Sequence, residues 1–205
     1  MGSDKDAKVV FTAESSDMWG ELDMVWKYLY PGISDDRLPV DEQSAAVLWQ
    51  RLASLALAVP AKSDNEAMIS KISGKTIGLN ENQMQIRTMS LQFRDKLCLL
   101  NITTDTTSYD LSYASGAWQP GETTMHGPNL FTRAKGNLDG LPPFKIAGAY
   151  KWNDDQSLEL TLRFIDCMHT RQFTFHFEDN NKVLVDINDG RFSRNNAPAI
   201  EGVMQ

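Results

Sequence analysis

The second half of the chain alternates apolar and polar residues with a period of two. The alternation is clearest in six stretches, at 88–93, 107–113, 144–152, 158–164, 173–177 and 183–187. A period of two is typical of β-strands that bury one face and expose the other. We therefore predict a series of half-buried strands after about residue 68.

The connections between these stretches indicate how the strands are joined. Arg94-Asp95, Asn153-Asp154-Asp155 and Asn180-Asn181 are short turn sequences, and such turns place consecutive strands antiparallel. About eight or nine strands joined in order predict an up-and-down barrel, which closes and so leaves no exposed sheet edge. The Gly- and Pro-rich connection at 115–143 interrupts the series, and we expect it to lie across one barrel end.

The first 60 residues show a different periodicity. A short β-branched run at 9–13 predicts one strand, and helical spacing follows from Met18 to Tyr30, with Ser16 or Asp17 as the N-cap. A second helix is predicted over 41–58. The fold class is α+β: residues 1–60 hold one strand, two helices and a linker, and residues 68–205 form the antiparallel barrel.

Composition excludes several classes of protein. The 205 residues are 41% hydrophobic and 23% charged, with a net charge of −7, which argues against a nucleic-acid partner. No apolar run approaches the roughly 18–20 residues that span a membrane. The N-terminus carries no export signal of its own, and the sequence leaves the cellular compartment open.

The sequence lacks the motifs that carry catalysis or bind cofactors. It contains no Gly-x-Ser-x-Gly, P-loop, His-Glu-x-x-His, dinucleotide-binding glycine pattern or Ser-x-x-Lys. Its three histidines have no metal-ligand spacing, and Cys98 and Cys167 are better explained as buried thiols than as a disulfide. We therefore predict no catalytic, cofactor-binding or metal-binding residue.

Inward-facing aromatic residues are the candidates for a barrel lining. They are Tyr109, Tyr150, Trp152, Phe173 and Phe175. A barrel of about eight strands is either filled by side chains or holds one small ligand. The many large residues favour a filled core.

Two segments resemble a known family. The opening "DKDAKVVFTAES" with the helix "DMWGELDMVWKYLYPGI" resembles the end of the catalytic domain in serine hydrolases of the class C β-lactamase and penicillin-binding-protein group. The segments "ISGKTIGLNEN" and "GAYKWNDDQSLELTLRF" are similar to the lipocalin-like C-terminal barrel of many such hydrolases. The family's Ser-x-x-Lys, Tyr-x-Asn and Lys-Thr-Gly elements are absent, so none of its catalytic residues can be assigned here.

The resemblance implies a non-catalytic accessory domain of a β-lactamase-related serine hydrolase, which would modulate substrate access or assembly. Its partner would be the catalytic domain of that hydrolase. The alternative is a barrel module that binds a small apolar ligand. The isolated run at Val9, Val10 and Phe11 also predicts a contact between copies of the chain.

Overall fold

The computed structural model describes residues 8–11, 17–34, 36–127, 142–165, 170–189 and 198–205. Contacts divide the chain into two compact units, Met1–Leu57 and Ala58–Gln205. Each unit is described by itself.

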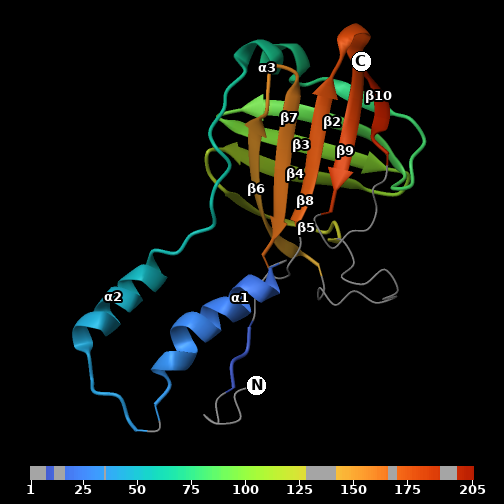
Figure 1. Ribbon diagram of the computed structural model, residues 1–205. Coiled ribbons are helices and arrows are strands. Elements are labelled where there is room, and N and C mark those ends of the chain that lie inside the picture. Colours follow the sequence, from blue (N-terminus) through green and yellow to red (C-terminus); the bar gives the residue numbers. More distant parts are fainter. Residues whose placement is uncertain (1–7, 12–16, 35, 128–141, 166–169, 190–197) are drawn as a thin grey trace. The chain divides into compact units, whose positions relative to one another are not determined.

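The first unit contains the two predicted helices (Figure 1). The first runs through α1 (Met18–Met24), the π-helical η1 (Val25–Leu29) and the 3₁₀ turn η2 (Tyr30–Gly32), and the second is α2 (Glu42–Ala53). Asp17 caps α1 by accepting a hydrogen bond from the Gly20 amide at 3.0 Å, and Asp41 caps α2 in the same way from Ser44 at 2.9 Å. Both helices are confirmed, although α2 ends five residues before the predicted boundary.

The strand predicted over residues 9–13 is wrong where it can be checked. Residues 9–11 form no strand, and 84% of Val10 is exposed. A single strand is not stable without a neighbour to accept and donate its backbone hydrogen bonds, and β-branched residues alone do not supply one. Residues 12 and 13 lie outside the described part of the chain.

The second unit is a closed β-barrel preceded by a short helix, α3 (Glu66–Ile72). Its strands are β1 (Thr76–Leu79), β2 (Ile86–Arg94), β3 (Leu97–Thr104), β4 (Ser108–Ser115), β5 (Gln119–Thr123), β6 (Phe144–Trp152), β7 (Ser157–Phe164), β8 (Thr170–Phe177), β9 (Lys182–Asn188) and β10 (Ile200–Met204). The hydrogen-bonded order is β4-β3-β2-β1-β10-β9-β8-β7-β6-β5. The predicted α+β fold with a lipocalin-like barrel is confirmed, except that the barrel is mixed: β4 and β6 pair in parallel, while the other strand pairs are antiparallel.

Two pairings close the barrel. The first and last strands, β1 and β10, pair antiparallel. On the other side β4 and β6 pair in parallel through Ala114–Ala149 and Ser115–Tyr150, while β5 pairs with the first half of β6. Nine strands therefore form the ring, with β5 beside the β4–β6 contact, which we call the seam.

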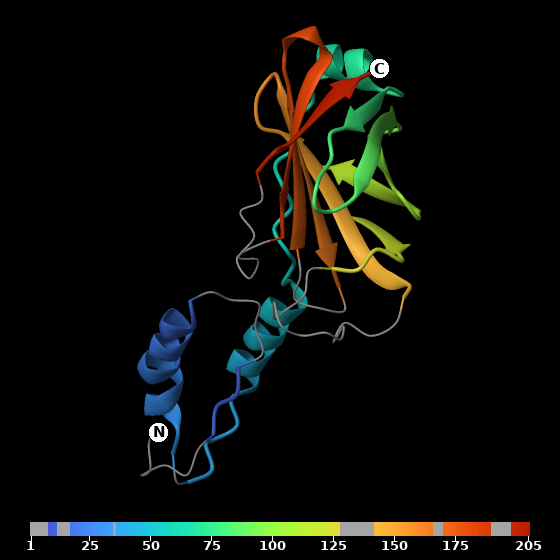
Figure 2. The ribbon, with the colours of Figure 1, turned by 90° about the vertical axis from the view of Figure 1, so that its right-hand side faces the viewer.

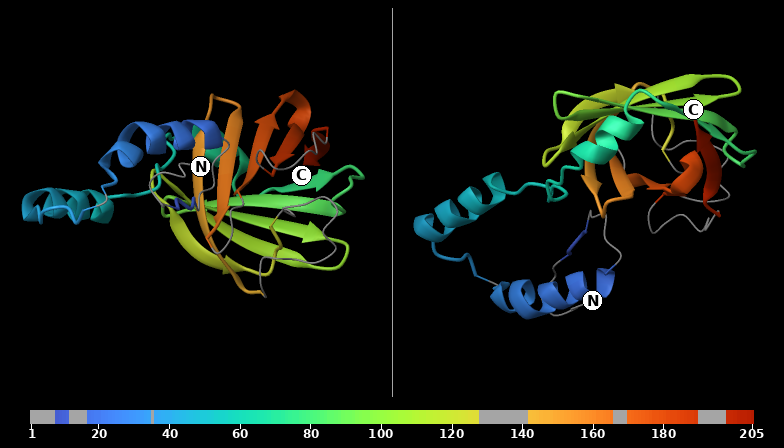
Figure 3. Two further views of the ribbon diagram at one scale, coloured as in Figure 1. Left: turned by 60° about the horizontal axis from the view of Figure 1, so that its bottom comes forward. Right: turned by 90° about the horizontal axis from the view of Figure 1, so that it is seen from above.

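Large apolar side chains from both walls of the barrel form its core. In β8, the alternate residues Phe173, Phe175 and Phe177 are at most 4% exposed, and they meet Leu158 and Leu160 of β7 in one continuous core. Figure 2 shows the wall of β1–β4, in green, facing the wall of β6–β10, in orange and red. Helix α3 covers one end, where Ile72 joins the core and Met68 and Ile69 pack against it. Figure 3 shows this end from above.

The predicted turns are present. Asp95 and Lys96 join β2 to β3 with φ of 50° and 67°, one residue later than predicted, and Asn180 and Asn181 join β8 to β9 with φ of 59° and 62°. Two consecutive residues in the left-handed region suit the right-handed twist of a hairpin. Asparagine and aspartate tolerate that region better than most side chains.

Candidate functional site

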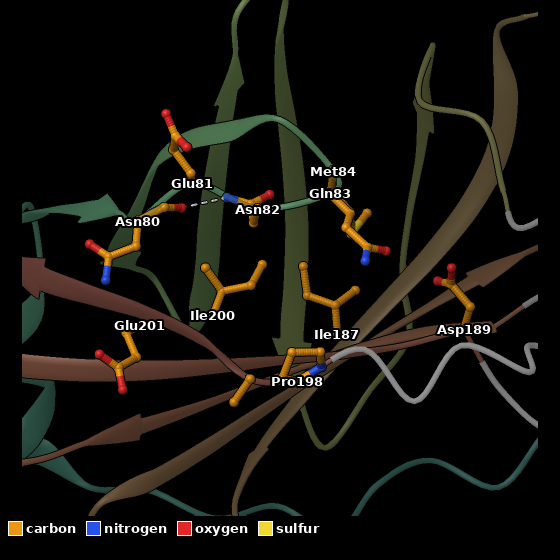
Figure 4. Close-up of a pocket in the computed structure, with 11 residues that line it drawn as sticks. Asn80, Glu81, Asn82, Gln83, Met84, Ile187, Asp189, Pro198, Ile200 and Glu201 are labelled. Carbon is orange, nitrogen blue, oxygen red and sulfur yellow. Dashed lines mark hydrogen bonds between the residues drawn. The ribbon is translucent and has the colours of Figure 1, made fainter.

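The candidate site lies at the barrel end opposite α3. Helix α3 precedes β1, and the connection at 80–85 follows it, so the two lie at opposite ends of that strand. The connection at 80–85 faces the end of β9 and the start of β10 across a cavity of about 570 Å³ (Figure 4). We call this the mouth cavity. It is lined by Asn80, Glu81, Asn82, Gln83, Met84, Ile187, Asp189, Pro198, Ala199, Ile200 and Glu201.

Hydrogen bonds hold the loop side of the mouth cavity in place. The Asn82 side chain accepts from the Ile86 amide at 3.2 Å and donates to the carbonyl oxygens of Ile86 and Asn80 at 2.8 and 2.9 Å. The Asn80 amide donates to the Glu201 carbonyl at 2.8 Å, which ties the loop to β10. The cavity is therefore formed by constrained backbone on two sides.

The opposite side of the cavity is apolar. Figure 4 shows Ile187 of β9 and Ile200 of β10 pointing toward the loop that carries Met84. Pro198 and Ala199 extend this surface. An apolar surface with a few polar groups at its edge is the usual composition of a small-molecule pocket.

The charged groups of the lining are acidic. Asp189 accepts two hydrogen bonds from Arg171, from Nε at 2.5 Å and from Nη2 at 3.1 Å. Glu201 lies 3.5 Å from the Lys182 ammonium in an exposed pair. No lysine, arginine or histidine is among the described lining residues, so a bound group would meet carboxylates and amides.

Arg171 is a buried charged residue behind the mouth cavity that sequence reasoning missed. It occupies the inward face of β8 together with Phe173, Phe175 and Phe177, and only 8% of its side chain is exposed. The alternation along β8 could have predicted that Arg171 faces inward, since it is in phase with the three phenylalanines. Its pairing with Asp189, distant in sequence, could not be read from that pattern.

The five predicted lining residues occupy the barrel interior or its edge. Phe173 and Phe175 are fully buried, Tyr150 is 3% and Trp152 is 7% exposed, and Tyr109 packs against the core. Tyr109 lines a separate cavity of about 230 Å³. None of the five lines the mouth cavity.

A polar group inside the core has no bonding partner. The Tyr113 hydroxyl is fully buried and makes no hydrogen bond with the described residues. Burial raises the pKa of Tyr113 well above its usual value and also raises the pKa of the neighbouring Cys98 thiol. Cys98 is a free, buried thiol, whereas Cys167 lies outside the described residues.

The described residues contain neither a metal-binding cluster nor a membrane-spanning helix. Within the described ranges, no group of three or more His, Cys, Asp or Glu side chains is arranged to hold a metal ion. None of the helices in the same ranges is long and apolar enough to cross a membrane.

Comparisons with known proteins give structural likeness alone. No family model and no curated protein matches the sequence. The apo crystal structure of Caenorhabditis elegans lipid binding protein 8 matches with a TM-score of 0.42 and 11% identity, covering 67% of this chain and 97% of that one. As-p18, an extracellular fatty acid binding protein, matches with a TM-score of 0.41 and 8% identity, covering 71% and 99%. These scores are too low to argue function, and nothing in them shows a β-lactamase-related parent.

Proposed function

We propose that the barrel is a binding module for a small, largely apolar ligand, and that the ligand occupies the mouth cavity. The observation that carries this proposal is the cavity itself. Its volume of about 570 Å³ falls within the roughly 300–1,000 Å³ typical of ligand pockets. The large buried side chains of the core, such as Phe173 and Phe175, favour the barrel end over its centre as the place for a ligand.

The lining residues are suited to binding a ligand rather than to catalysing a reaction. Its polar groups are amides and carboxylates, and the described lining residues include no serine, cysteine, histidine or lysine. Covalent catalysis needs such a nucleophile and a base within hydrogen-bond reach of each other. The apolar surface of Ile187 and Ile200 would exclude water from the ligand's body, and the amides of Asn80 and Gln83 would orient its polar end.

Titration with Nile red, a neutral and environment-sensitive dye, tests the proposal. We expect saturable binding that weakens at least tenfold in Ala199→Trp, which puts an indole into the cavity. Val203→Trp is the matched control, because Val203 lies on β10, which follows Ala199 directly, is 55% exposed and does not line the cavity. Absence of saturable binding, or equal binding by the two variants, would refute the proposal.

The charge of the preferred ligand can be read from the same assay. Dodecanol should displace the dye at lower concentration than laurate, because a carboxylate would approach Glu81 and Glu201 and like charges repel. Arg191 and Arg194 follow Asp189 in the sequence and lie outside the described residues. Tighter binding of laurate would show that basic groups beyond the described lining set the specificity.

A second candidate function rests on the first unit. Its helices expose large apolar side chains, including 81% of Trp19, 69% of Trp49 and 56% of Leu48. We propose that these helices dock on a serine hydrolase domain, as the sequence resemblance implies. Apolar faces of this kind mark protein–protein contacts.

The docking proposal is tested by capturing partners from a lysate labelled with a fluorescent penicillin. The chain should retain a labelled hydrolase, and Trp49→Glu should lose it. Retention of no labelled protein by either form would refute docking on this class of enzyme. A concentration-dependent mass in light scattering that Val10→Glu abolishes would instead support the contact between copies through residues 9–11.

A further inference from the structure

The segment at residues 62–65 meets the shortest strand pairing of the barrel. The β4–β6 seam consists of two residue pairs, whereas each of the other strand pairs in the described sheet has at least three. Strand β6 continues past the seam to Trp152, beyond its last partner in β4. Residues 62–65 meet the two strands at this point, and we call them the clasp.

The clasp is hydrogen-bonded to both strands of the seam. The Trp152 amide donates to the Ser63 hydroxyl at 2.5 Å, in the place where a pairing strand would supply a carbonyl. The Ser115 hydroxyl, at the end of β4, donates to the Ser63 carbonyl at 3.4 Å. Ser63 thus bonds to β6 through its side chain and to β4 through its backbone.

The neighbouring residues of the clasp are fixed as well. Asn65 donates to the Asp155 carbonyl at 3.0 Å in the β6–β7 turn and also caps α3 by accepting from the Met68 amide at 3.1 Å. In the turn after β4, Gly116 has φ of +66°, and a Cβ on it would lie 3.0 Å from Cβ of Lys62. The clasp therefore spans from the β4–β5 turn to the β6–β7 turn.

Reactive and titratable side chains lie behind the seam. Tyr113 pairs with Cys98, and its ring is within 2.9 Å of the position that a Cβ on Gly148 of β6 would take. Tyr150 pairs with Ser115 across the seam. Cys98 is fully buried, so a reagent can reach its thiol only when the surrounding structure opens.

We propose that the clasp is a conformational latch: when residues 62–65 are released, β4 separates from β6 and the interior around Cys98 opens while the other walls remain paired. The inference goes beyond ligand binding at the mouth, which lies at the opposite barrel end. The clasp is continuous with residues 58–61, which lead to the first unit.

Thiol labelling of Cys98 with Ellman's reagent tests the latch. The protein carries Cys167→Ser, so that Cys98 is the only thiol. Ser63→Ala removes the acceptor of the Trp152 amide and is expected to raise the labelling rate more than tenfold. Thr104→Ala is the matched control, since the Thr104 hydroxyl accepts from the Thr107 amide at 3.1 Å in the β3–β4 turn, at the end of the barrel away from the seam.

The Cys98 labelling rate of each variant is compared with its free energy of global unfolding, which is measured by denaturant unfolding. In the control, the labelling rate should rise only as far as lost global stability requires. In Ser63→Ala it should exceed that amount, and hydrogen exchange should accelerate in residues 149–152 but not in β7 and β8. If labelling in both variants tracks global unfolding alike, or exchange rises evenly over the barrel, the latch is refuted.

A second variant tests the latch if Ser63→Ala does not fold. Asn65→Asp removes the bond donated to the Asp155 carbonyl, keeps an oxygen that can accept from the Met68 amide and cap α3, and leaves Ser63 in place. It should raise the Cys98 labelling rate by a smaller factor in the same direction. No change in rate at unchanged stability would overturn the proposal.

Discussion

Gly148→Ala tests how closely the two strands approach at the seam. A Cβ at position 148 would collide with the Ser112 carbonyl oxygen of β4 and would lie 2.9 Å from Cδ1 of Tyr113 and 3.1 Å from the Ser112 carbonyl carbon. Two of these three atoms belong to backbone, and β4 is held from its other side by its pairing with β3. The clash therefore cannot be relieved by rotating a side chain.

The expected cost follows from this geometry. Overpacking a core costs about 1–3 kcal/mol when side chains can adjust. Because β4 must move here, we expect the free energy of unfolding to fall by about 3 kcal/mol or more. For a domain of this size, that corresponds to a fall in the melting temperature on the order of 10 °C.

Two other glycines of the barrel serve as matched controls. A Cβ on Gly121 would lie 3.7 Å from the Ile146 side chain, and one on Gly78 would lie 3.5 Å from the Gln205 side chain. Both are ordinary contacts, so Gly121→Ala and Gly78→Ala should change stability by less than about 1 kcal/mol. Urea unfolding followed by tryptophan fluorescence measures all three. If Gly148→Ala unfolds at the same urea concentration as its controls, β4 and β6 do not cross as closely as the structure has them.

Three further predictions concern the buried polar groups. Asp189→Asn should lower the free energy of unfolding, measured in urea, by about 3 kcal/mol, because it leaves the Arg171 guanidinium, which is 8% exposed, without its partner. Arg171→Met should lower it by less, because Asp189 is 21% exposed and can be rehydrated. The reverse order would refute this account. Tyr113→Phe should raise the free energy of unfolding by about 1 kcal/mol, since it removes a buried hydroxyl without a partner, and a loss in thermal melts would reveal a hidden partner. Burial raises the pKa of Cys98 above its ordinary 9.0. The free energy of unfolding should therefore be constant with respect to this thiol below about pH 9 and fall by about 1.4 kcal/mol per pH unit above it. Cys98→Ala should flatten the pH dependence of unfolding in this range, and an unchanged slope would contradict the assignment.

The regular part of the barrel could be predicted from the sequence because its signal is local. Along β8, three phenylalanines alternate with Thr174 and His176, and the structure buries the former and leaves the latter partly exposed. Asn180-Asn181 marks a turn through its own backbone preference. Each of these features depends on residues within one strand or one turn.

The short elements were missed because their stability comes from partners distant in sequence. Strand β1 has four residues and pairs with β2 and β10, and β10 pairs with β1 and β9. Strand β5 contains Pro120 and Gly121 and lay inside a predicted connection, yet pairing with β6 forms it. Helix α3 has seven residues and is stabilised by the Asn65 cap and by burial of Ile72. These contacts cannot be inferred from the local sequence of any one element.

The candidate site could not be predicted for the same reason, and the five residues chosen instead show why. Large inward-facing aromatic residues indicate which face is buried, but they fill a barrel as readily as they line a cavity. The mouth cavity is set by a loop and two strand ends that meet across the β1–β10 pairing, and Asn80 and Glu201 are joined there although they are separated by most of the barrel sequence. Closure of the ring therefore has two consequences at its opposite ends. At the β1–β10 junction it brings the first and last strands together around a space, and at the β4–β6 seam it leaves a short pairing that Ser63 completes.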